Sequence, residues 1–493
     1  MSIVILSIYG IALVLILVYS IMQMSLVYNY RSNRNKNKAG EASVNFATGN
    51  DSRPFVTVQL PLYNEMYVVE RLIDTVVAFD YPKDRFEIQV LDDSTDESLE
   101  ISRKKVEEVK KKGFQADLIV RPERIGFKAG ALEYGLKLAK GEFIAVFDAD
   151  FIPDPDFLNK TIPYFNDDKI GVVQTRWGHI NKNYSLLTRL QAFGLDAHFT
   201  VEQMGRNAGG HFINFNGTAG VWRKSCIEDA GGWEHDTLTE DLDLSYRAQL
   251  KGWKFRFLEH VVTPAELPVV MSALKNQQFR WTKGGAENFV KMAPRIIKHK
   301  QIPLKTKIHG LFHLFNSTIF LCVFATAFLS VPVLFIKSGN PQYGIIFNIS
   351  SLFLLCTAML MAFYWTSYQE KSPNIFTNIR KFISSFVLFL STSMGLSLHN
   401  SMAVIEGYAG KKSAFIRTPK FNIVKRSDSW KGNVYLQTKL DKITILEGVM
   451  TLYFLFAIVS SVILNEYGLL PFHIMLFWGF GFVFWLSVRQ INH

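Results

Sequence analysis

The chain has 493 residues, of which 48% are hydrophobic and 20% are charged, and its formal net charge is +11. This length exceeds that of one ordinary domain, and the apolar content, with 41 phenylalanines, indicates that part of the chain lies in lipid. The basic balance suits a cytoplasmic membrane surface or nucleic acid, but zinc-finger, basic-zipper and RNA-binding aromatic patterns are absent, so no nucleic-acid partner is predicted.

The first predicted element is a membrane helix at the amino terminus. Residues 4–28 carry no charge and are long enough to span a bilayer. They lack the early positive region and the small-residue cleavage site of a signal peptide, which favours a transmembrane signal anchor over residues 1–30. The basic run "RSNRNKNK" follows at 31–38, inside a predicted linker at 31–52. Basic flanks stay in the cytoplasm, so the amino terminus is expected outside.

Residues 53–266 are typical of a soluble α/β domain. The apolar runs "FVTVQL", "FEIQVL" and "EFIAVF" end in polar or acidic residues, and helical stretches such as 98–112 and 129–139 separate them. This alternation predicts a mostly parallel, Rossmann-like sheet that binds ligands at the carboxyl ends of its strands. Residues 267–306 are amphipathic and basic, as expected of an interfacial segment.

The predicted membrane region, 307–493, contains apolar spans at about 309–335, 343–366, 382–407, 444–464 and 469–489. If every span crossed, the basic loop at 408–442 would face outside, against the tendency of short basic loops to remain cytoplasmic. His399, Asn400 and Glu406 also make the third span a poor crossing helix. We therefore predict five crossings in the chain, an interfacial or re-entrant third span, and a cytoplasmic loop after it.

Carboxylates follow two of the predicted strands. "FEIQVL" ends in Asp92-Asp93, and "EFIAVF" ends in Asp148-Ala149-Asp150. A D-x-D pair can hold Mg²⁺ or Mn²⁺, and such an ion neutralises a departing diphosphate. Two solvated acidic loops would give the same pattern, so the pair alone is weak evidence for a metal site.

Two further motifs follow in chain order. "TED" at 239–241 comes after a Gly-rich turn, and "QQFRW" at 277–281 lies just before the composition turns apolar. Trp and Arg also favour a bilayer edge without any catalytic role, and an Asp is common at the start of a helix. The ordered set D, D-x-D, T-E-D and Q-x-x-R-W is far more specific than any of its members.

The motif set resembles the processive family 2 glycosyltransferases, which include cellulose, hyaluronan and chitin synthases. The resemblance is carried by "QLPLYNE", "QVLDDSTDES", "GFKAGAL", "VFDADFIPDPDFL", "HFTVEQ", "FNGTAGVWR", "TEDLDLSYRAQLKGWKF" and "QQFRW", and it covers about Phe55–Phe289. It is strongest for the plant cellulose-synthase-like A and C proteins, the mannan and xyloglucan-backbone synthases. It implies a GT-A type fold, a cytoplasmic catalytic domain and an inverting hexosyltransferase. Such an enzyme would polymerise GDP-mannose or UDP-glucose into a β-linked, 1,4-linked mannan, glucomannan or glucan and extrude it.

The resemblance also implies roles for individual residues. The donor-binding set is Glu65, Asp92, Asp93, Lys128 and Asp148, and the metal ligands are Asp148 and Asp150. The catalytic set is Glu240, Asp241, Gln277, Arg280 and Trp281, with Asp241 as the general base. The acceptor is expected at Phe215, Gly217 and Trp281, because an aromatic plane suits the apolar C–H face of a sugar. Without the motif, Lys128 would be interpreted as a solvated lysine at a helix start.

"FIRTPK" at 415–420 resembles the gating loop F-x-V-T-x-K of cellulose synthase. Phe415, Thr418 and Lys420 match that loop, whereas Arg417 replaces its Val. In the family this loop closes over the active site from the cytoplasm, which agrees with the topology predicted from charge. A basic loop resting on anionic headgroups is an equal alternative.

Two other functions stay open. An enzyme that transfers one sugar to a membrane lipid, like ceramide glucosyltransferase, would carry similar motifs, and a catalytically inactive membrane scaffold could keep the same fold. The five crossings and "FIRTPK" favour the polymerase, and the complete acidic set argues against the scaffold. The predicted partners are a nucleotide sugar, a growing glycan and the lipid bilayer of a bacterial inner membrane or a Golgi membrane. No motif specifies a protein partner.

Overall fold

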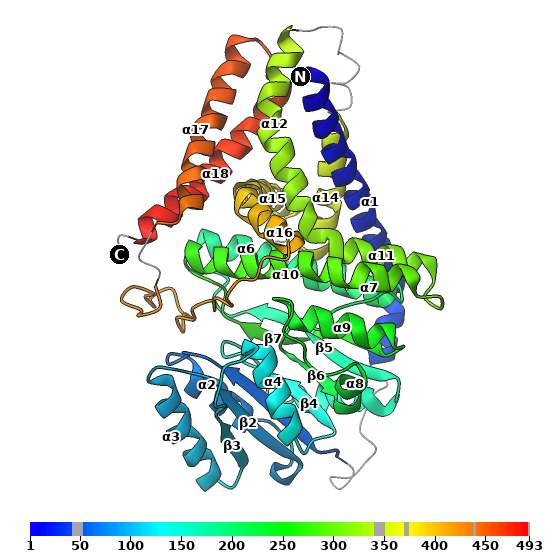
Figure 1. Cartoon of the computed structure of the whole chain (residues 1–493), viewed down its shortest axis with the longest axis vertical. Coiled ribbons are helices and arrows are strands. Elements are labelled where there is room, and N and C mark those ends of the chain that lie inside the picture. Colours follow the sequence, from blue (N-terminus) through cyan, green and yellow to red (C-terminus); the bar gives the residue numbers. More distant parts are fainter. Residues whose placement is uncertain (42–52, 340–350, 369–373, 437–439, 492–493) are drawn as a thin grey trace.

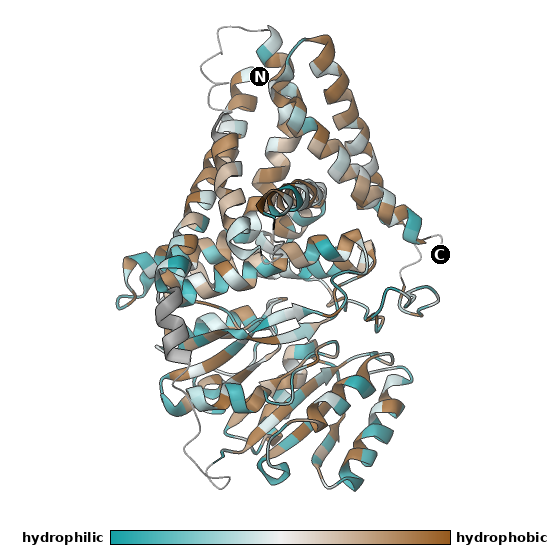
Figure 2. Cartoon of the chain, turned by 180° about the vertical axis from the view of Figure 1, so that it is seen from behind, coloured by the Kyte–Doolittle hydropathy of each residue, from teal (hydrophilic) through white to brown (hydrophobic). Residues whose placement is uncertain are grey.

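The computed structural model describes residues 1–41, 53–339, 351–368, 374–436 and 440–491. An α/β region forms the lower half of the molecule in Figure 1, and long helices rise from it along the long axis. These helices carry long stretches of strongly apolar residues, whereas the lower half mixes polar and apolar residues (Figure 2). Parts of three predicted segments, at 31–52, 343–366 and 408–442, fall outside the described residues.

The lower region is built on one sheet, whose seven strands run in the order β3-β2-β1-β4-β6-β5-β7 across the described residues. The strands are β1 (Val56–Leu62), β2 (Phe86–Asp92), β3 (Gln115–Ile119), β4 (Phe143–Val146), β5 (Ile170–His179), β6 (Gly220–Arg223) and β7 (Lys254–Ala265). Strands β1 to β4 pair in parallel, as do β5 and β7, while β6 runs antiparallel between β4 and β5. Strands β2 and β4 are buried along their whole length. Strand β4 is accordingly apolar throughout, and the buried polar side chains of β2, Glu87 and Gln89, form hydrogen bonds with Thr57 and Gln59 of β1. The predicted mostly parallel α/β sheet is confirmed.

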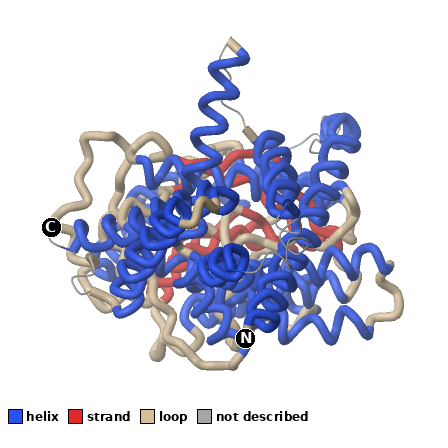
Figure 3. Tube along the Cα trace, turned by 90° about the horizontal axis from the view of Figure 1, so that it is seen from above, coloured by secondary structure: helices blue, strands red, loops and turns tan. Residues whose placement is uncertain are grey.

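Helices cover both faces of this sheet and bury a hydrophobic core on each side. They are α2 (Val69–Val77), α3 (Ser98–Lys111), α4 (Phe127–Leu138), α5 (Phe157–Thr161), α8 (Lys224–Asp229) and α9 (Glu240–Leu250), with short turns η2 (Lys83–Arg85) and η3 (Ile162–Asn166). One core contains Phe147 and Phe157, and the other contains Leu132 and Trp222, all fully or almost fully buried. From above, helices crowd over the strands (Figure 3).

A layer of helices separates the sheet from the long helices (Figure 1). It comprises α6 (Leu186–Ala197), the π-helix η4 (His198–Gln203), α7 (Met204–Ala208), α10 (Met271–Lys298) and α11 (Leu304–Phe315). Helix α10 is tied to the long helices by a buried ion pair between Lys275 and Glu447, with 2.5 Å between Nζ and Oε2. The predicted segment at 267–306 therefore coincides with α10 and the start of α11, and its position at a membrane surface stays a prediction.

Four helical stretches among the described residues are long and apolar enough to cross a membrane: Ser2–Asn33, Leu304–Gly339, Lys442–Ile463 and Tyr467–Ile491. They contain α1 (Ser2–Glu41), η5 (Asn316–Thr318), α12 (Ile319–Gly339), α17 (Lys442–Ile463), η7 (Tyr467–Leu469) and α18 (Leu470–Ile491). They coincide with four of the five predicted crossings. The described part of the fifth is the shorter apolar helix Leu354–Ser367 within α14 (Ser351–Ser367), so that crossing stays a prediction.

The third predicted span is a bent pair, α15 (Ile375–Gly395) and α16 (Ser397–Tyr408), which meet at 49°. Helix α15 is seen nearly end-on in Figure 1, so it lies across the long axis that α1 and α12 follow. At the bend, Gly395 lies so close to α18 that a Cβ there would be 2.3 Å from the carbonyl oxygen of Gly479. Two of the three polar residues that disfavoured a crossing are partnered. His399 contacts the backbone oxygen of Lys275, with 3.1 Å from Nε2, and Glu406 pairs with Lys411 at 2.5 Å, whereas the buried amide of Asn400 has no hydrogen-bond partner among the described residues. This geometry is compatible with an interfacial or re-entrant segment.

Candidate active site

A cavity of about 180 Å³ lies at the carboxyl ends of the central strands, and residues of α10 and of the segment 415–420 complete its lining. Its lining includes every site residue predicted from the sequence except Asp92 and Phe215. Those residues are Glu65, Asp93, Lys128, Asp148, Asp150, Gly217, Glu240, Asp241, Gln277, Arg280, Trp281, Phe415, Thr418 and Lys420. Residues far apart in the sequence thus converge because parallel strands end at one edge of the sheet.

The two exceptions, Asp92 and Phe215, are buried away from the cavity, so their predicted contacts with substrate stay predictions that this lining does not include. Asp92 is fully buried and accepts hydrogen bonds from the backbone N of Ser94 (2.8 Å) and from Oγ of Ser102 (2.5 Å). Successive side chains of a strand point to opposite faces, so Asp92 and Asp93 cannot both face the cavity. Phe215 is fully buried in the core, 5.4 Å from the ring of Trp222.

Asp93 is held by an arginine that the sequence analysis missed. Both carboxylate oxygens of Asp93 accept hydrogen bonds from Arg121, with 3.0 Å from Nε to Oδ1. Arg121 also donates to the backbone oxygen of Ile125 (2.8 Å), so it fixes the loop before α4. The guanidinium carbon of Arg124, in that loop, lies 3.3 Å from the ring centroid of Tyr63, and both residues line the cavity. No sequence pattern marked this arginine pair.

Lys128 connects three parts of the cavity. Its Nζ donates to Oδ1 of Asp148 (2.5 Å) and to the backbone oxygen of Gly217 (2.8 Å). Burial by itself lowers the pKa of Lys128, but the charges of Asp148 and Glu240 outweigh burial and raise the pKa above its ordinary value. Lys128 is therefore a stable cation inside the site, and it is not the solvated lysine that its place at a helix start would suggest.

Gly217 lies beside the predicted base in a conformation that favours glycine. Its φ is +79°, and a Cβ added there would lie 3.1 Å from Oδ2 of Asp241. A side chain would crowd the carboxylate and strain the backbone. The glycine therefore keeps the space next to Asp241 open.

Asp148 and Asp150 follow β4, and each pairs with a lysine. Lys128 binds Asp148, and Nζ of Lys420 lies 2.7 Å from Oδ2 of Asp150. The other oxygens, Oδ2 of Asp148 and Oδ1 of Asp150, accept no hydrogen bond from the described part of the chain. Two carboxylates on one loop with one open oxygen each suit a hard divalent cation, which prefers oxygen ligands.

Asp241 and Glu240 begin α9 inside the cavity. Burial, followed by the charge of neighbouring Glu240, raises the pKa of Asp241 to about 7. Burial likewise raises the pKa of Glu240. A helix start favours a carboxylate and holds it rigidly. A carboxyl group with a pKa near neutral pH can take up a proton during a reaction and release it afterwards.

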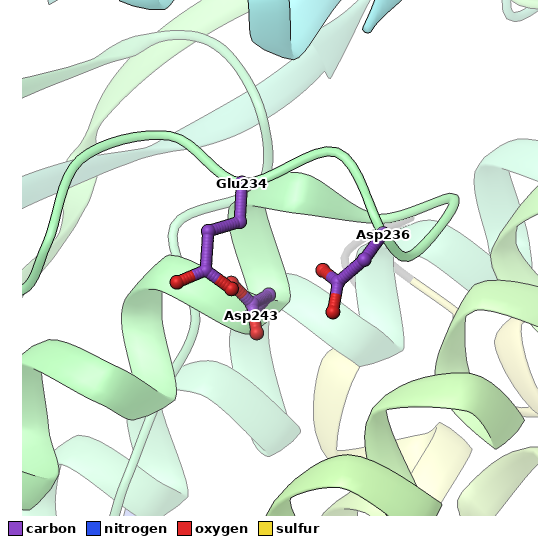
Figure 4. A group of neighbouring side chains, drawn as sticks. All are labelled: Glu234, Asp236 and Asp243. Carbon is purple, nitrogen blue, oxygen red and sulfur yellow. The ribbon is translucent and has the colours of Figure 1, made fainter.

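The start of α9 is anchored to α10 by one lysine. Figure 4 shows Glu234, Asp236 and Asp243, whose carboxylate oxygens lie within 4.8 Å of one another. Nζ of Lys291 lies 2.6 Å from Glu234, 2.7 Å from Asp236 and 2.7 Å from Asp243. The ammonium group takes the place that a cation would have among these carboxylates. Because Asp243 lies two residues after Asp241, Lys291 fixes the predicted base relative to the helix that carries Trp281.

The Q-x-x-R-W motif lies on α10 and faces the cavity. Arg280 donates from Nη2 to Oγ1 of Thr418 (2.9 Å), and its guanidinium carbon lies 4.5 Å from the ring centroid of Phe415. The ring of Trp281 lies 6.4 Å from that of Trp177 on β5. The motif therefore contacts the predicted gating loop on one side and an aromatic wall on the other.

The predicted gating loop lies over the cavity and is held there by charged contacts. Phe415 stacks on Phe127, with ring centroids 5.8 Å apart, and Lys420 pairs with Asp150. Arg417, the departure from the family pattern, lies 2.6 Å from Oε2 of Glu65. Burial raises the pKa of Glu65 to about 7, although Arg417 and Lys420 act in the opposite direction. The role of Arg417 could not be found from the sequence, because its partner is far away in the chain.

Two larger cavities adjoin the active-site cavity and share Trp281 with it. One, of about 360 Å³, is lined by residues of α1, α12, α14, α15 and α16, and it also contains Gln277. The other, of about 320 Å³, contains Asp241. Their lining mixes aromatic rings with hydroxyl and amide groups, including Tyr19 and Asn316. The three cavities meet at Trp281 and extend from the sheet edge into the long helices.

Comparisons with known proteins agree with this geometry. Residues 53–284 match the family described as glycosyltransferase-like family 2. The chain is 36% identical over 407 residues to glucomannan 4-beta-mannosyltransferase 1 of Oryza sativa subsp. japonica, covering 78% of this chain and 73% of that protein. It is 34% identical over 431 residues to glucomannan 4-beta-mannosyltransferase 9 of Arabidopsis thaliana, covering 83% and 76%. Glucomannan 4-beta-mannosyltransferase 7 of the same plant is 39% identical over 339 residues, covering 65% and 61%.

A solved structure also resembles the chain. The mannosyltransferase PcManGT of Pyrobaculum calidifontis, determined in complex with GDP-Man and Mn²⁺, aligns with a TM-score of 0.52. The alignment covers 83% of this chain and all of that one, at 19% sequence identity. At this identity the likeness concerns the fold, and it confirms the predicted GT-A type architecture of the α/β region.

Proposed function

The chain belongs to glycosyltransferase family 2, and on that premise we propose that it is a membrane-embedded, inverting polysaccharide synthase. It takes hexose from GDP-mannose or UDP-glucose, builds a β-1,4-linked mannan, glucomannan or glucan, and extrudes the product. The relatives named for 4-beta-mannosyl transfer support a mannose-containing product. The donor site contains the groups that such a transfer requires.

In the proposed transfer, Asp241 acts as the general base. A hydroxyl oxygen of the acceptor attacks C1 of the donor sugar, and the bond from C1 to the diphosphate oxygen breaks. The hydroxyl proton passes to Asp241, and the nucleoside diphosphate leaves with the bonding electrons. The pKa of about 7 suits this role, because general bases are most effective when their pKa lies near the working pH. Attack from the face opposite the diphosphate inverts the configuration at C1.

Two cations of the chain bind the departing diphosphate in this proposal. Lys128 lies beside Asp148, and Arg280 lies beside the loop that covers the cavity. Asp148 and Asp150 would hold Mg²⁺ or Mn²⁺, which supplies further positive charge to the leaving group. Lys420, which pairs with Asp150, would be within the same site as the donor phosphates and could contact them, so the predicted gating loop would respond to the donor.

The observation that carries the proposal is the meeting of three cavities at Trp281. An acceptor sugar stacked on this ring would have its attacking end next to Asp241 and its far end in the cavity among α1, α12 and α16. Single transfer to a lipid needs no second cavity that extends from the acceptor position among the long helices. The predicted gating loop and the donor site are expected in the cytoplasm, where nucleotide sugars are available. The protein is expected to cross the membrane several times.

Reconstituted full-length protein tests the proposal. Nucleoside diphosphate release is measured with a panel that includes GDP-mannose and UDP-glucose, with Mg²⁺ or Mn²⁺ present. The product is then sized and digested with a β-1,4-mannanase or a β-1,4-glucanase. A long, digestible glycan is the expected result. A lipid carrying one sugar would instead identify a single-transfer enzyme, and no turnover with any donor would identify a scaffold.

A further inference from the structure

A second large cavity lies away from the active site, between the α/β region and the membrane helices. It has a volume of about 620 Å³ and lies where α6, the end of α14 and α15 meet. Its lining contains Lys182, Arg189, Arg380 and Lys381, together with hydroxyl groups such as that of Ser384. Neither the donor site nor the proposed glycan path includes these residues.

The cavity carries excess positive charge. Among the described residues of its lining, Asp196 is the one carboxylate, and this group already pairs with Arg176 (3.0 Å), His179 (3.2 Å) and Lys182 (3.7 Å). Arg189, Arg380 and Lys381 form no ion pair with any carboxylate of the described ranges. These three side chains are exposed, and with no acidic partner in the described part of the chain they are free to contact a bound anion, which would lower their mutual repulsion.

The walls of the cavity are fixed by aromatic packing. The ring of Phe193 on α6 stacks on Tyr364 of α14 at 5.2 Å and contacts Phe389 of α15 at 5.3 Å. Tyr368, at the end of α14, contacts Phe382 of α15 at 5.4 Å. Three elements are therefore held together around the cavity, which makes it a built feature of the fold.

Helix α15 has the pattern of a helix that lies on a membrane. Ile375, Ile379, Ile383 and Val387 follow each other at intervals of four residues, and each is between 39% and 55% exposed. Of the residues of α15 that line the cavity, Lys381 lies on the other side of the helix by the same periodicity, and Arg380 lies at the edge of the apolar stripe, next to Val387. Apolar residues on one face and basic residues on the other are typical of interfacial helices that bind anionic lipid.

We propose that this cavity binds the phosphate headgroup of an anionic glycerophospholipid. Arg189, Arg380 and Lys381 would bind the phosphate, and the acyl chains would follow the apolar stripe of α15 into the bilayer. Charge-assisted contacts from arginine to phosphate are strong and directional. Tyr368 and Trp365, at the end of the apolar helix α14, are placed as aromatic residues at a membrane surface are. The inference adds a lipid site to the proposed enzyme and is independent of which sugar it transfers.

The test uses the full-length protein in nanodiscs of phosphatidylcholine, with or without phosphatidylglycerol, followed by native mass spectrometry of the released protein. The test variant is Arg189→Gln/Arg380→Gln/Lys381→Gln. The matched control, Lys298→Gln/Lys300→Gln/Lys305→Gln, removes three exposed charges near the junction of α10 and α11. The test variant should retain at least about tenfold less phosphatidylglycerol than wild type, since each basic residue strengthens anionic lipid binding several-fold. The control variant should retain as much as wild type.

A second variant, Ser384→Trp, narrows the cavity without changing its charge, and it should cause a similar loss of bound lipid. Nucleoside diphosphate release in phosphatidylcholine alone verifies that each variant is folded. Equal retention by the test variant and wild type would overturn the proposal. Equal loss in test and control variants would also overturn it, because the attraction would then be a general property of the basic surface. Complete displacement of the lipid by excess inorganic phosphate would identify a soluble-anion site instead.

Discussion

Transferase activity should fall as the pH drops through neutrality, because the proposed general base is a buried carboxyl group. Burial and the charge of Glu240 raise the pKa of Asp241 to about 7. The base works in its ionised form, so activity is present above this pKa and is lost below it. At about one pH unit below the pKa, roughly one tenth of the molecules carry ionised Asp241, so kcat/KM should be about tenfold below its plateau. An aspartate with an ordinary pKa of about 4 would show no change in this range.

Substitution of the neighbouring residue tests the physical cause of the shift. Glu240→Gln keeps the shape of the side chain and removes its charge, so the pKa of Asp241 should fall and the acid limb should move to lower pH. Burial remains, so the limb should stay above the ordinary value for aspartate. Asp241→Asn is close in shape but cannot take the proton, and it should lower turnover by about 10²–10⁴-fold while donor binding persists.

The assay is the initial rate of nucleoside diphosphate release at low donor concentration across the neutral range, since kcat/KM reports the pKa values of the free enzyme. Donor binding to Asp241→Asn at each pH serves as the control for effects on the donor site. A flat profile in wild type would refute the assignment of Asp241 as the base. An unchanged acid limb in Glu240→Gln would refute the contribution of Glu240, and Asp241→Asn turnover within a few-fold of wild type would refute the mechanism.

Three further predictions concern the metal, the topology and the position of the base. Chelation of divalent metal should stop transfer, and Asp150→Ala should have the same effect. Added Mg²⁺ or Mn²⁺ should restore activity to the chelated wild type but not to Asp150→Ala. Full activity of the wild type in excess chelator would contradict the predicted metal site. A cysteine introduced at Ser427 should not react with impermeant thiol reagents added outside intact cells, whereas a cysteine introduced at Ser338 should react. Background labelling should be low because the native cysteines are buried. External labelling at Ser427 would place the predicted gating loop outside the cell. Lys291→Met should lower kcat by at least about tenfold and leave the donor KM unchanged. Asp236 would lose its ion partner, Glu234 and Asp243 would share Arg247 alone, and their repulsion would displace the start of α9. A kcat equal to that of the exposed control Lys298→Met would contradict this.

The sequence determined the chemistry of this protein to a large extent. Carboxylates at the ends of β2 and β4, the "TED" and "QQFRW" motifs and their order predicted the residues that converge on one cavity. The alternation of strands and helices predicted the mostly parallel sheet. The uncharged apolar runs predicted five crossings, and four of these coincide with described helical stretches long enough to cross a membrane. These features depend on residue type and local periodicity, which can be read along the chain.

The tertiary structure decided which side chains of each motif face the site and which distant residues they meet. Asp93 faces the cavity and Asp92 does not, because strand pleating sends neighbours to opposite sides. Arg417 forms an ion pair with Glu65, and Lys291 forms ion pairs with the carboxylates near Asp241. A motif specifies residue types over a few positions, whereas an ion pair between distant segments depends on how helices and loops dock. That docking is set by the burial of apolar surface, which the local pattern of a motif does not encode.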